Sequence, residues 1–228
     1  MNMRKFLAVL TLLPLVLLLR PLSGSAQEQA TNRFARWEKE IAAFEAADKT
    51  NPPPQNAILF IGSSSIRMWQ SLAKDFPEHQ VINRGFGGSH LADSVHFADR
   101  IVFPYQPRTI VLYAGTNDIN DKKTPEQVLA DFKAFVAKVH ARLPETRIAF
   151  ISTAPNPARW KLVEQFKTLN RLAEEYTKTN PKLAFIDVFT PMLGEDGQPS
   201  RDIYLSDKLH MNAQGYAIWK QVIGRYLN

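Results

Sequence analysis

The chain has 228 residues, a formal net charge of +6 and no cysteine. This length fits a single domain of ordinary size. The absence of cysteine excludes disulfide bonds, thiol catalysis and thiolate metal sites. The mild positive charge comes without a dense run of basic residues, and this argues against binding to nucleic acid.

The first 26 residues are typical of a secretory signal peptide. Arg4 and Lys5 precede an apolar run over residues 6–19, and small residues lead up to Ala26, after which we expect cleavage. The alternative is an uncleaved membrane anchor, but the run is shorter than the roughly 20 apolar residues of a spanning helix. Cleavage removes three basic residues and no acidic one, so the mature net charge is +3. We therefore expect an exported protein without stable membrane insertion.

Residues 27–56 form a lead-in to the main domain. Phe34, Trp37, Ile41 and Phe44 recur at spacings of three and four residues, which predicts an amphipathic helix. The prolines at positions 52–54 end this helix and form a rigid connector.

Residues 57–228 alternate between short apolar runs and longer amphipathic segments. The apolar runs are continuous, which predicts strands buried on both faces of a parallel sheet, at 57–61, 80–83, 109–113, 147–152 and 183–188. The segments between and after them predict helices at 65–76, 89–103, 124–143, 157–180 and 212–226. Thr124, Pro125 and Gln127 read as an N-cap, a first-turn proline and a capping box. This alternation predicts one α/β domain with a mainly parallel five-stranded sheet.

Four polar segments follow the predicted strands, where ligands bind in open parallel sheets. The first is a glycine and three serines at 62–65, and the second is a glycine-rich loop at 83–89. The third is a Gly-Thr-Asn-Asp segment at 115–118, and the fourth, at 206–212, precedes the last helix. Each has an ordinary structural reading as a turn or a helix cap. The glycine loop lacks the spacing of known phosphate-binding loops, which argues against a nucleotide-binding domain.

The fourth segment contains a candidate general base. Asp207 precedes His210 by three residues, and this spacing lets the carboxylate reach one ring nitrogen of the imidazole. The other ring nitrogen is then free to take a proton from a hydroxyl, which is a poor nucleophile without such a base. A surface ion pair is the alternative reading, and His90 with Asp93 is a competing pair.

Together these four segments resemble the blocks of the SGNH hydrolases, also called the GDSL esterase/lipase family, over the region from about Ala57 to the C-terminus. The resemblance implies a flavodoxin-like, three-layer α/β/α fold. It implies a catalytic serine at Ser64, oxyanion-hole residues Ser64, Gly88 and Asn117, and a base pair of Asp207 and His210. The family's usual Gly-Asp-Ser reads Gly-Ser-Ser here, so Ser63 and Ser65 stay open as alternative nucleophiles.

The resemblance implies a serine ester hydrolase that transfers an acyl group to water without a cofactor or metal. The expected partner is a small ester, either of a lipid, as for a lysophospholipase or lipase, or of a carbohydrate, as for an O-acetylesterase. A binding protein that kept the fold and lost the chemistry is a further alternative. Phe86, Trp160 and Tyr204 are candidate substrate-binding residues, although aromatic residues of this kind equally suit a core.

Overall fold

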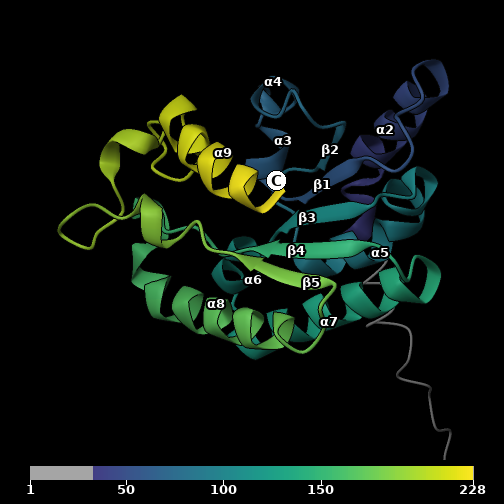
Figure 1. Ribbon diagram of the computed structural model, residues 1–228. Helices are drawn as coiled ribbons and strands as arrows, with labels where there is room; N and C mark the ends of the chain where they lie inside the picture. The colour runs from purple at the N-terminus through teal and green to yellow at the C-terminus, as the bar shows by residue number, and fades with distance from the viewer. Residues whose placement is uncertain (1–32, 228) are drawn as a thin grey trace, which may run out of the picture. The chain divides into compact units, whose positions relative to one another are not determined.

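The structure is a computed structural model that describes residues 33–227 (Figure 1). The predicted signal peptide, residues 1–26, lies outside the described residues. The chain divides into two units, residues 1–35 and 36–228. Of the first unit only residues 33–35 are described, and they are helical.

One five-stranded sheet organises the second unit, and all its strands are parallel. They are β1 (Ile58–Gly62), β2 (Val81–Gly85), β3 (Thr109–Tyr113), β4 (Arg147–Ile151) and β5 (Leu183–Ile186), in the spatial order β2-β1-β3-β4-β5. The order turns around at β1, which has β2 on one side and β3 on the other. The predicted fold class and all five strands are therefore confirmed, with bounds that shift by one or two residues.

Helices cover both faces of the sheet, which makes three layers (Figure 1). Below the sheet in Figure 1 lie α7 (Pro125–Arg142) and α8 (Val163–Thr177), and α5 (Leu91–Ile101) packs against α7. Above it lie α3 (Ser64–Arg67), α4 (Leu72–Asp75) and α9 (Ala213–Leu227). Helix α2 (Glu38–Thr50) packs against α5.

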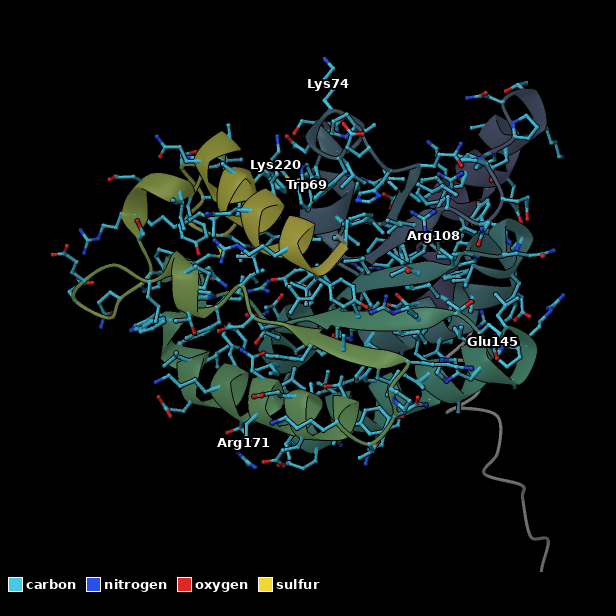
Figure 2. All side chains as sticks on the ribbon, in the orientation of Figure 1. Trp69, Lys74, Arg108, Glu145, Arg171 and Lys220 are labelled. Carbon is cyan, nitrogen blue, oxygen red and sulfur yellow. The ribbon has the colours of Figure 1, made fainter. Side chains whose placement is uncertain are left out.

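The apolar side chains alternate between these two layers, as successive residues of a strand must. Phe60 and Val111 lie in one buried cluster with Trp69 and with Trp219 of α9. On the opposite face, the ring of Phe150 lies 4.7 Å from that of Phe132 of α7. Lys74 and Arg171 extend outward from the two outer layers (Figure 2).

Two predicted helices differ in the structure. The segment 65–76 is not one helix, because the buried Trp69 turns into the core and Ser71 starts the separate helix α4, with its hydroxyl bonded to Asp75 at 2.5 Å. The segment 157–180 begins with a 3-10 helix, η2 (Pro157–Leu162), before α8. A third difference is α6 (Thr116–Asn120), since that segment was expected to be a turn.

The predicted start of α7 is confirmed. Thr124 accepts a hydrogen bond from the backbone of Gln127 at 3.3 Å, and the Gln127 side chain accepts one from the backbone of Thr124 at 2.9 Å. Asn212, which was expected to begin the last helix, instead caps α9 by accepting from the backbone of Gln214 at 2.9 Å. Over the described residues, no helix combines the length and the apolar character needed to cross a membrane.

The close approach of β1 to β3 at Gly62 generates a stability prediction. Gly62 has a φ of +136°, and a Cβ there would lie 1.9 Å from the Tyr113 carbonyl oxygen. We expect Gly62→Ala to lower the free energy of unfolding by about 3 kcal/mol or more, since strain and a backbone clash act together. Urea denaturation measures this.

Gly224→Ala is the matched control. Gly224 lies inside α9, and a Cβ there would lie 3.8 Å from Phe76, which is an ordinary van der Waals distance. Because alanine favours the helix more than glycine does, we expect the free energy of unfolding to rise by up to about 1 kcal/mol. Equal unfolding midpoints for Gly62→Ala and the wild-type protein would contradict the assigned role of Gly62.

Candidate active site

Ser64 stands at the carboxyl end of the central strand β1, as the first residue of α3. Gly62 makes the turn, and the backbone N–H of Ser63 donates to the Tyr113 carbonyl at 3.0 Å. This contact directs Ser63 inward, where it is 2% exposed, and leaves the Ser64 side chain half-buried at the pocket. As the first helical residue, Ser64 has no acceptor for its N–H within α3. The geometry therefore distinguishes Ser64 from Ser63 as the accessible hydroxyl.

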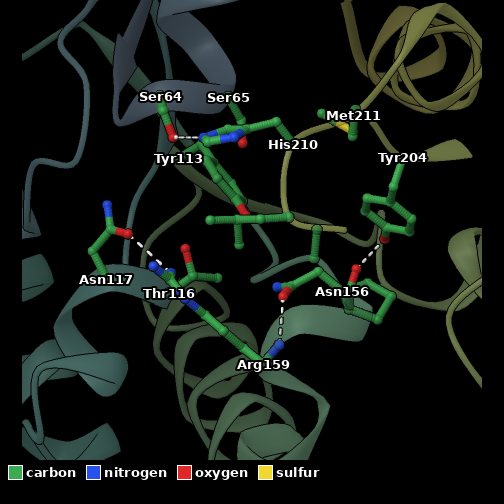
Figure 3. Close-up of a pocket in the computed structure, with 13 residues that line it drawn as sticks. Ser64, Ser65, Tyr113, Thr116, Asn117, Asn156, Arg159, Tyr204, His210 and Met211 are labelled. Atoms are coloured by element: carbon green, nitrogen blue, oxygen red, sulfur yellow. Dashed lines mark hydrogen bonds between the residues drawn. The ribbon is translucent and has the colours of Figure 1, made fainter. Parts of the chain in front are cut away.

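Asp207 and His210 come from the loop before α9 and meet Ser64. The Nε2 atom of His210 lies 3.0 Å from the Ser64 Oγ (Figure 3). The Nδ1 atom of the same ring lies 2.6 Å from the Asp207 Oδ2. Asp207 Oδ1 also accepts from the backbone N–H groups of Leu209 and His210, each at 2.9 Å. Three side chains thus form one continuous line of hydrogen bonds.

These contacts keep Asp207 ionised. Partial burial on its own would raise the pKa of this carboxyl, but the hydrogen bonds from the His210 ring and from the backbone of His210 and Leu209 outweigh it and lower the pKa to about 2. The negative charge next to Nδ1 favours the tautomer that carries a proton there. Nε2 is then an acceptor facing the Ser64 hydroxyl.

The loop that carries Asp207 and His210 is closed on itself. Tyr204 and Met211 form an isolated antiparallel bridge, and the backbone N–H of Leu205 donates to the His210 carbonyl at 2.8 Å. Between them Lys208 adopts a φ of +58°, a left-handed conformation that is uncommon outside glycine. The imidazole is therefore held by backbone structure as well as by its partners.

Asn117 lies in α6, directly after β3. Its Nδ2 donates to the Ser89 carbonyl at 3.0 Å, and its Oδ1 accepts from Arg159 Nη1 at 2.9 Å (Figure 3). The first bond ties α6 to the glycine loop, in which Gly88 precedes Ser89 and has a φ of +72°. Gly88 itself is not among the residues that line the pocket, whereas Asn117 is.

A buried group of charged side chains also joins α6 to the start of α5, which directly follows the glycine loop. The Asp118 carboxylate is fully buried and accepts from the Leu91 N–H at 3.2 Å, while Lys123 lies 3.1 Å from it. Burial raises the pKa of Asp118, and the nearby His90 and Lys123 oppose this. His90 binds Asp121 at 2.8 Å, and its backbone N–H donates to Asp93. The competing pair His90 and Asp93 therefore belongs to the start of α5, away from the Ser64 hydroxyl.

The pocket at Ser64 is small and partly open to solvent, and both polar and apolar side chains line it. Its volume is about 20 Å³, and the walls comprise Ser64, Ser65, Tyr113, Thr116, Asn117, Ala154, Pro155, Asn156, Arg159, Tyr204, Leu209, His210 and Met211. A cavity of this volume holds only one or two water-sized groups.

Of the three aromatic residues predicted to bind substrate, only Tyr204 reaches the pocket. Its hydroxyl is bonded to the Pro155 carbonyl (Figure 3). Phe86 is fully buried and packs edge-on against Trp37 at 5.7 Å, because the strand β2 directs it into the core. Trp160 is half-buried and lies outside the lining. Two wall residues, Tyr113 and Arg159, are not among the candidates that the sequence offers, because Tyr113 ends a strand that is predicted to be buried and Arg159 lies in the predicted helix 157–180.

Residues 61–218 match the profile of the GDSL-like Lipase/Acylhydrolase family. No curated protein is significantly similar to the chain.

Several solved structures share the fold. One is a protein of Streptococcus pneumonia, provisionally described as a platelet activating factor, with 23% identity, a TM-score of 0.75 and coverage of 89% of this chain and 98% of that one. A GDSL-like lipase from Bacteroides thetaiotaomicron has 21% identity, a TM-score of 0.67 and coverage of 85% and 96%.

A third similar structure is a variant of an acetyl-xylooligosaccharide esterase from Geobacillus Stearmophilus, with 13% identity, a TM-score of 0.62 and coverage of 77% and 95%. At these identities the likenesses concern the fold alone. The family profile, in contrast, spans more than half of the sequence, including the segments of Ser64, Asn117 and His210. The chain therefore belongs to the GDSL-like lipase/acylhydrolase family.

Proposed function

We propose that this protein is a serine ester hydrolase in which Ser64 is the nucleophile, His210 the general base and Asp207 the residue that orients the base. The observation that carries the proposal is the unbroken line from Asp207 through His210 to the Ser64 hydroxyl, with contacts of 2.6 and 3.0 Å. The alternative, a surface ion pair of Asp207 and His210, does not account for the contact of the second ring nitrogen with a half-buried serine that lines a pocket.

The proposed reaction proceeds in two acyl transfers. The Ser64 oxygen attacks the ester carbonyl while His210 Nε2 takes the hydroxyl proton, and the proton then passes to the departing alcohol. Water, activated by the same imidazole, attacks the acyl-serine and releases the acid. Asp207 holds the imidazole in place and stabilises its charged form, but stays ionised throughout.

The oxyanion of each tetrahedral intermediate needs hydrogen-bond donors. We assign this task to the backbone N–H groups of Ser64 and Gly88 and to the Asn117 amide. The Asn117 Nδ2 has two hydrogens and uses one of them on Ser89, so the other is available to the substrate. The bond between Asn117 and Ser89 also supports the assignment of Gly88, because it brings the glycine loop beside α6.

The pocket favours esters of short acids. The space beside Ser64 is narrow, and hydroxyl, amide and guanidinium groups line it together with apolar side chains, so a small acyl group such as acetyl suits it better than a long chain. This supports the O-acetylesterase alternative over a lysophospholipase or lipase, and one protein of the same fold is an acetyl-xylooligosaccharide esterase. We therefore propose a short-chain ester, such as an O-acetylated sugar, as the substrate.

Covalent labelling tests the nucleophile. An alkyl fluorophosphonate should modify Ser64 alone, and Ser64→Ala should remove labelling and lower kcat by several orders of magnitude with little change in Tm. Mass spectrometry of the digested protein locates the adduct.

Ser63→Ala is the matched control for this labelling, because Ser63 is adjacent in sequence but buried. It should retain labelling. An adduct on Ser63 or Ser65 would show that the wrong serine is assigned, and no adduct on the folded protein would exclude serine catalysis.

The low pKa of Asp207 generates a pH prediction. Its carboxylate stays ionised down to about pH 2, so its contact with His210 stabilises the fold above the ordinary aspartate pKa near 4 and is lost only between about pH 4 and 2. The free energy of unfolding, measured by urea denaturation between pH 5 and 2, should therefore fall over this interval and not above it.

Asp207→Asn should lower kcat by about 10³- to 10⁴-fold, since the amide favours the wrong tautomer. Asp202→Asn, which changes an exposed carboxylate preceding the same loop, should leave kcat unchanged. Equal effects of the two substitutions would refute the role of Asp207.

A series of 4-nitrophenyl esters tests the acyl preference. We expect kcat/KM to fall at least tenfold from acetate to octanoate, because the longer chain finds no room beside Ser64. Acetylated xylooligosaccharide and a lysophospholipid complete the comparison. A preference for octanoate or the lysophospholipid would overturn the short-chain assignment without affecting the nucleophile.

A further inference from the structure

Arg159 is the one arginine or lysine among the residues that line the catalytic pocket. It lies in η2 and is half-buried, and within residues 33–227 its side chain has no carboxylate partner at ion-pair distance. Burial lowers the pKa of Arg159, while Tyr113 and Asp121 oppose this. Withdrawing a cation from water without an anionic partner is unfavourable. Arg159 takes no direct part in the proposed acyl transfer.

The contact of Arg159 with Asn117 has a directional consequence. A guanidinium can only donate hydrogen bonds, so the amide group that faces it must be the oxygen. Arg159 Nη1 lies 2.9 Å from the Asn117 Oδ1. The amide nitrogen must then point to the opposite side, where it meets the Ser89 carbonyl at 3.0 Å. Without Arg159, only the bond to the Ser89 carbonyl would hold the amide in this orientation, and a half-turn of the amide would present its oxygen, which would repel an oxyanion.

The structure also fixes Arg159 relative to the catalytic loop. The Asn156 side chain accepts from the Arg159 backbone N–H at 2.9 Å (Figure 3). The N–H of the neighbouring Ala158 donates to the Lys208 carbonyl at 3.1 Å, and Tyr204 is bonded to the Pro155 carbonyl. The loop of residues 155–159 therefore contacts both the Asn117 amide and the loop that carries His210.

We propose that Arg159 is a positioning residue that fixes the orientation of the Asn117 amide and so keeps its N–H aimed at the oxyanion. The inference rests on the proposed serine esterase function. Arg159 acts through Asn117 and does not touch the reacting atoms. Its effect therefore belongs to the transition state and should appear in kcat and not in KM.

A double-mutant cycle tests this, with 4-nitrophenyl acetate as a small uncharged substrate. Loss of an oxyanion donor lowers kcat by about 10²- to 10³-fold. Arg159→Met should lower kcat by about 10- to 10²-fold and change KM by less than about threefold. In the Asn117→Ala background, where no amide remains to be oriented, the same substitution should change kcat by less than about threefold.

Three measurements complete the design. Lys161→Met removes an exposed cation from the same 3-10 helix and should leave kcat unchanged. The Tm of each variant shows that it is folded, and Arg159→Gln, whose amide can also accept, replaces Arg159→Met if the latter does not fold. Inactivation by the fluorophosphonate should slow by the same factor as kcat, because its phosphoryl oxygen occupies the oxyanion position.

Three results would overturn the inference. Losses that multiply in the double variant would show that Arg159 acts independently of Asn117, and a rise in KM with unchanged kcat would show that it binds substrate directly. An Arg159→Met enzyme as active as the wild type would also refute it. Failure of the proposed function looks different, since the wild-type protein itself would then show no hydrolysis that depends on Ser64.

Discussion

The 3.0 Å contact between His210 Nε2 and Ser64 Oγ joins two segments that are 146 residues apart in the sequence. Each of the two side chains is positioned by the backbone of its own segment. Ser64 depends on the sharp turn that Gly62 makes against Tyr113, and His210 depends on a loop closed between Tyr204 and Met211. Because both segments lie at the carboxyl edge of one parallel sheet, the fold brings them together before any substrate arrives.

The sheet order explains why the remaining parts of the site lie near this contact. β1 is central and carries Ser64, β2 on one side leads to Gly88, and β3 on the other leads to Asn117. The bond from Asn117 to the Ser89 carbonyl and the buried carboxylate of Asp118 hold the two flanking loops together across the end of β1. These hydrogen bonds and charges hold in place the polar groups that would stabilise an oxyanion, which favours a preorganised site.

Much of this could be predicted from the sequence, because the signals are local. The continuous apolar runs predict the five parallel strands, and the Thr124–Gln127 pattern predicts the start of α7. The spacing of Asp207 and His210 indicates a candidate base, and the family resemblance of the four polar segments implies Ser64 and Asn117. The contact of Arg159 with Asn117 was not predictable, since 42 residues separate them and only the folded loop after β4 brings them together. The burial of Phe86 and the break at Trp69 were missed for a related reason. An aromatic side chain in a loop or helix does not reveal by its spacing whether it faces a pocket or the core.

A crystal structure of the Ser64 adduct with a methyl phosphonate tests the account most directly, because it shows the nucleophile and the oxyanion donors together. The account predicts a covalent bond from phosphorus to the Ser64 Oγ, with one phosphoryl oxygen about 2.7–3.1 Å from the Ser64 N, the Gly88 N and the Asn117 Nδ2. It also predicts that Arg159 remains on the Asn117 Oδ1. A phosphorus atom on another residue, or a phosphoryl oxygen that faces away from Asn117, would contradict it.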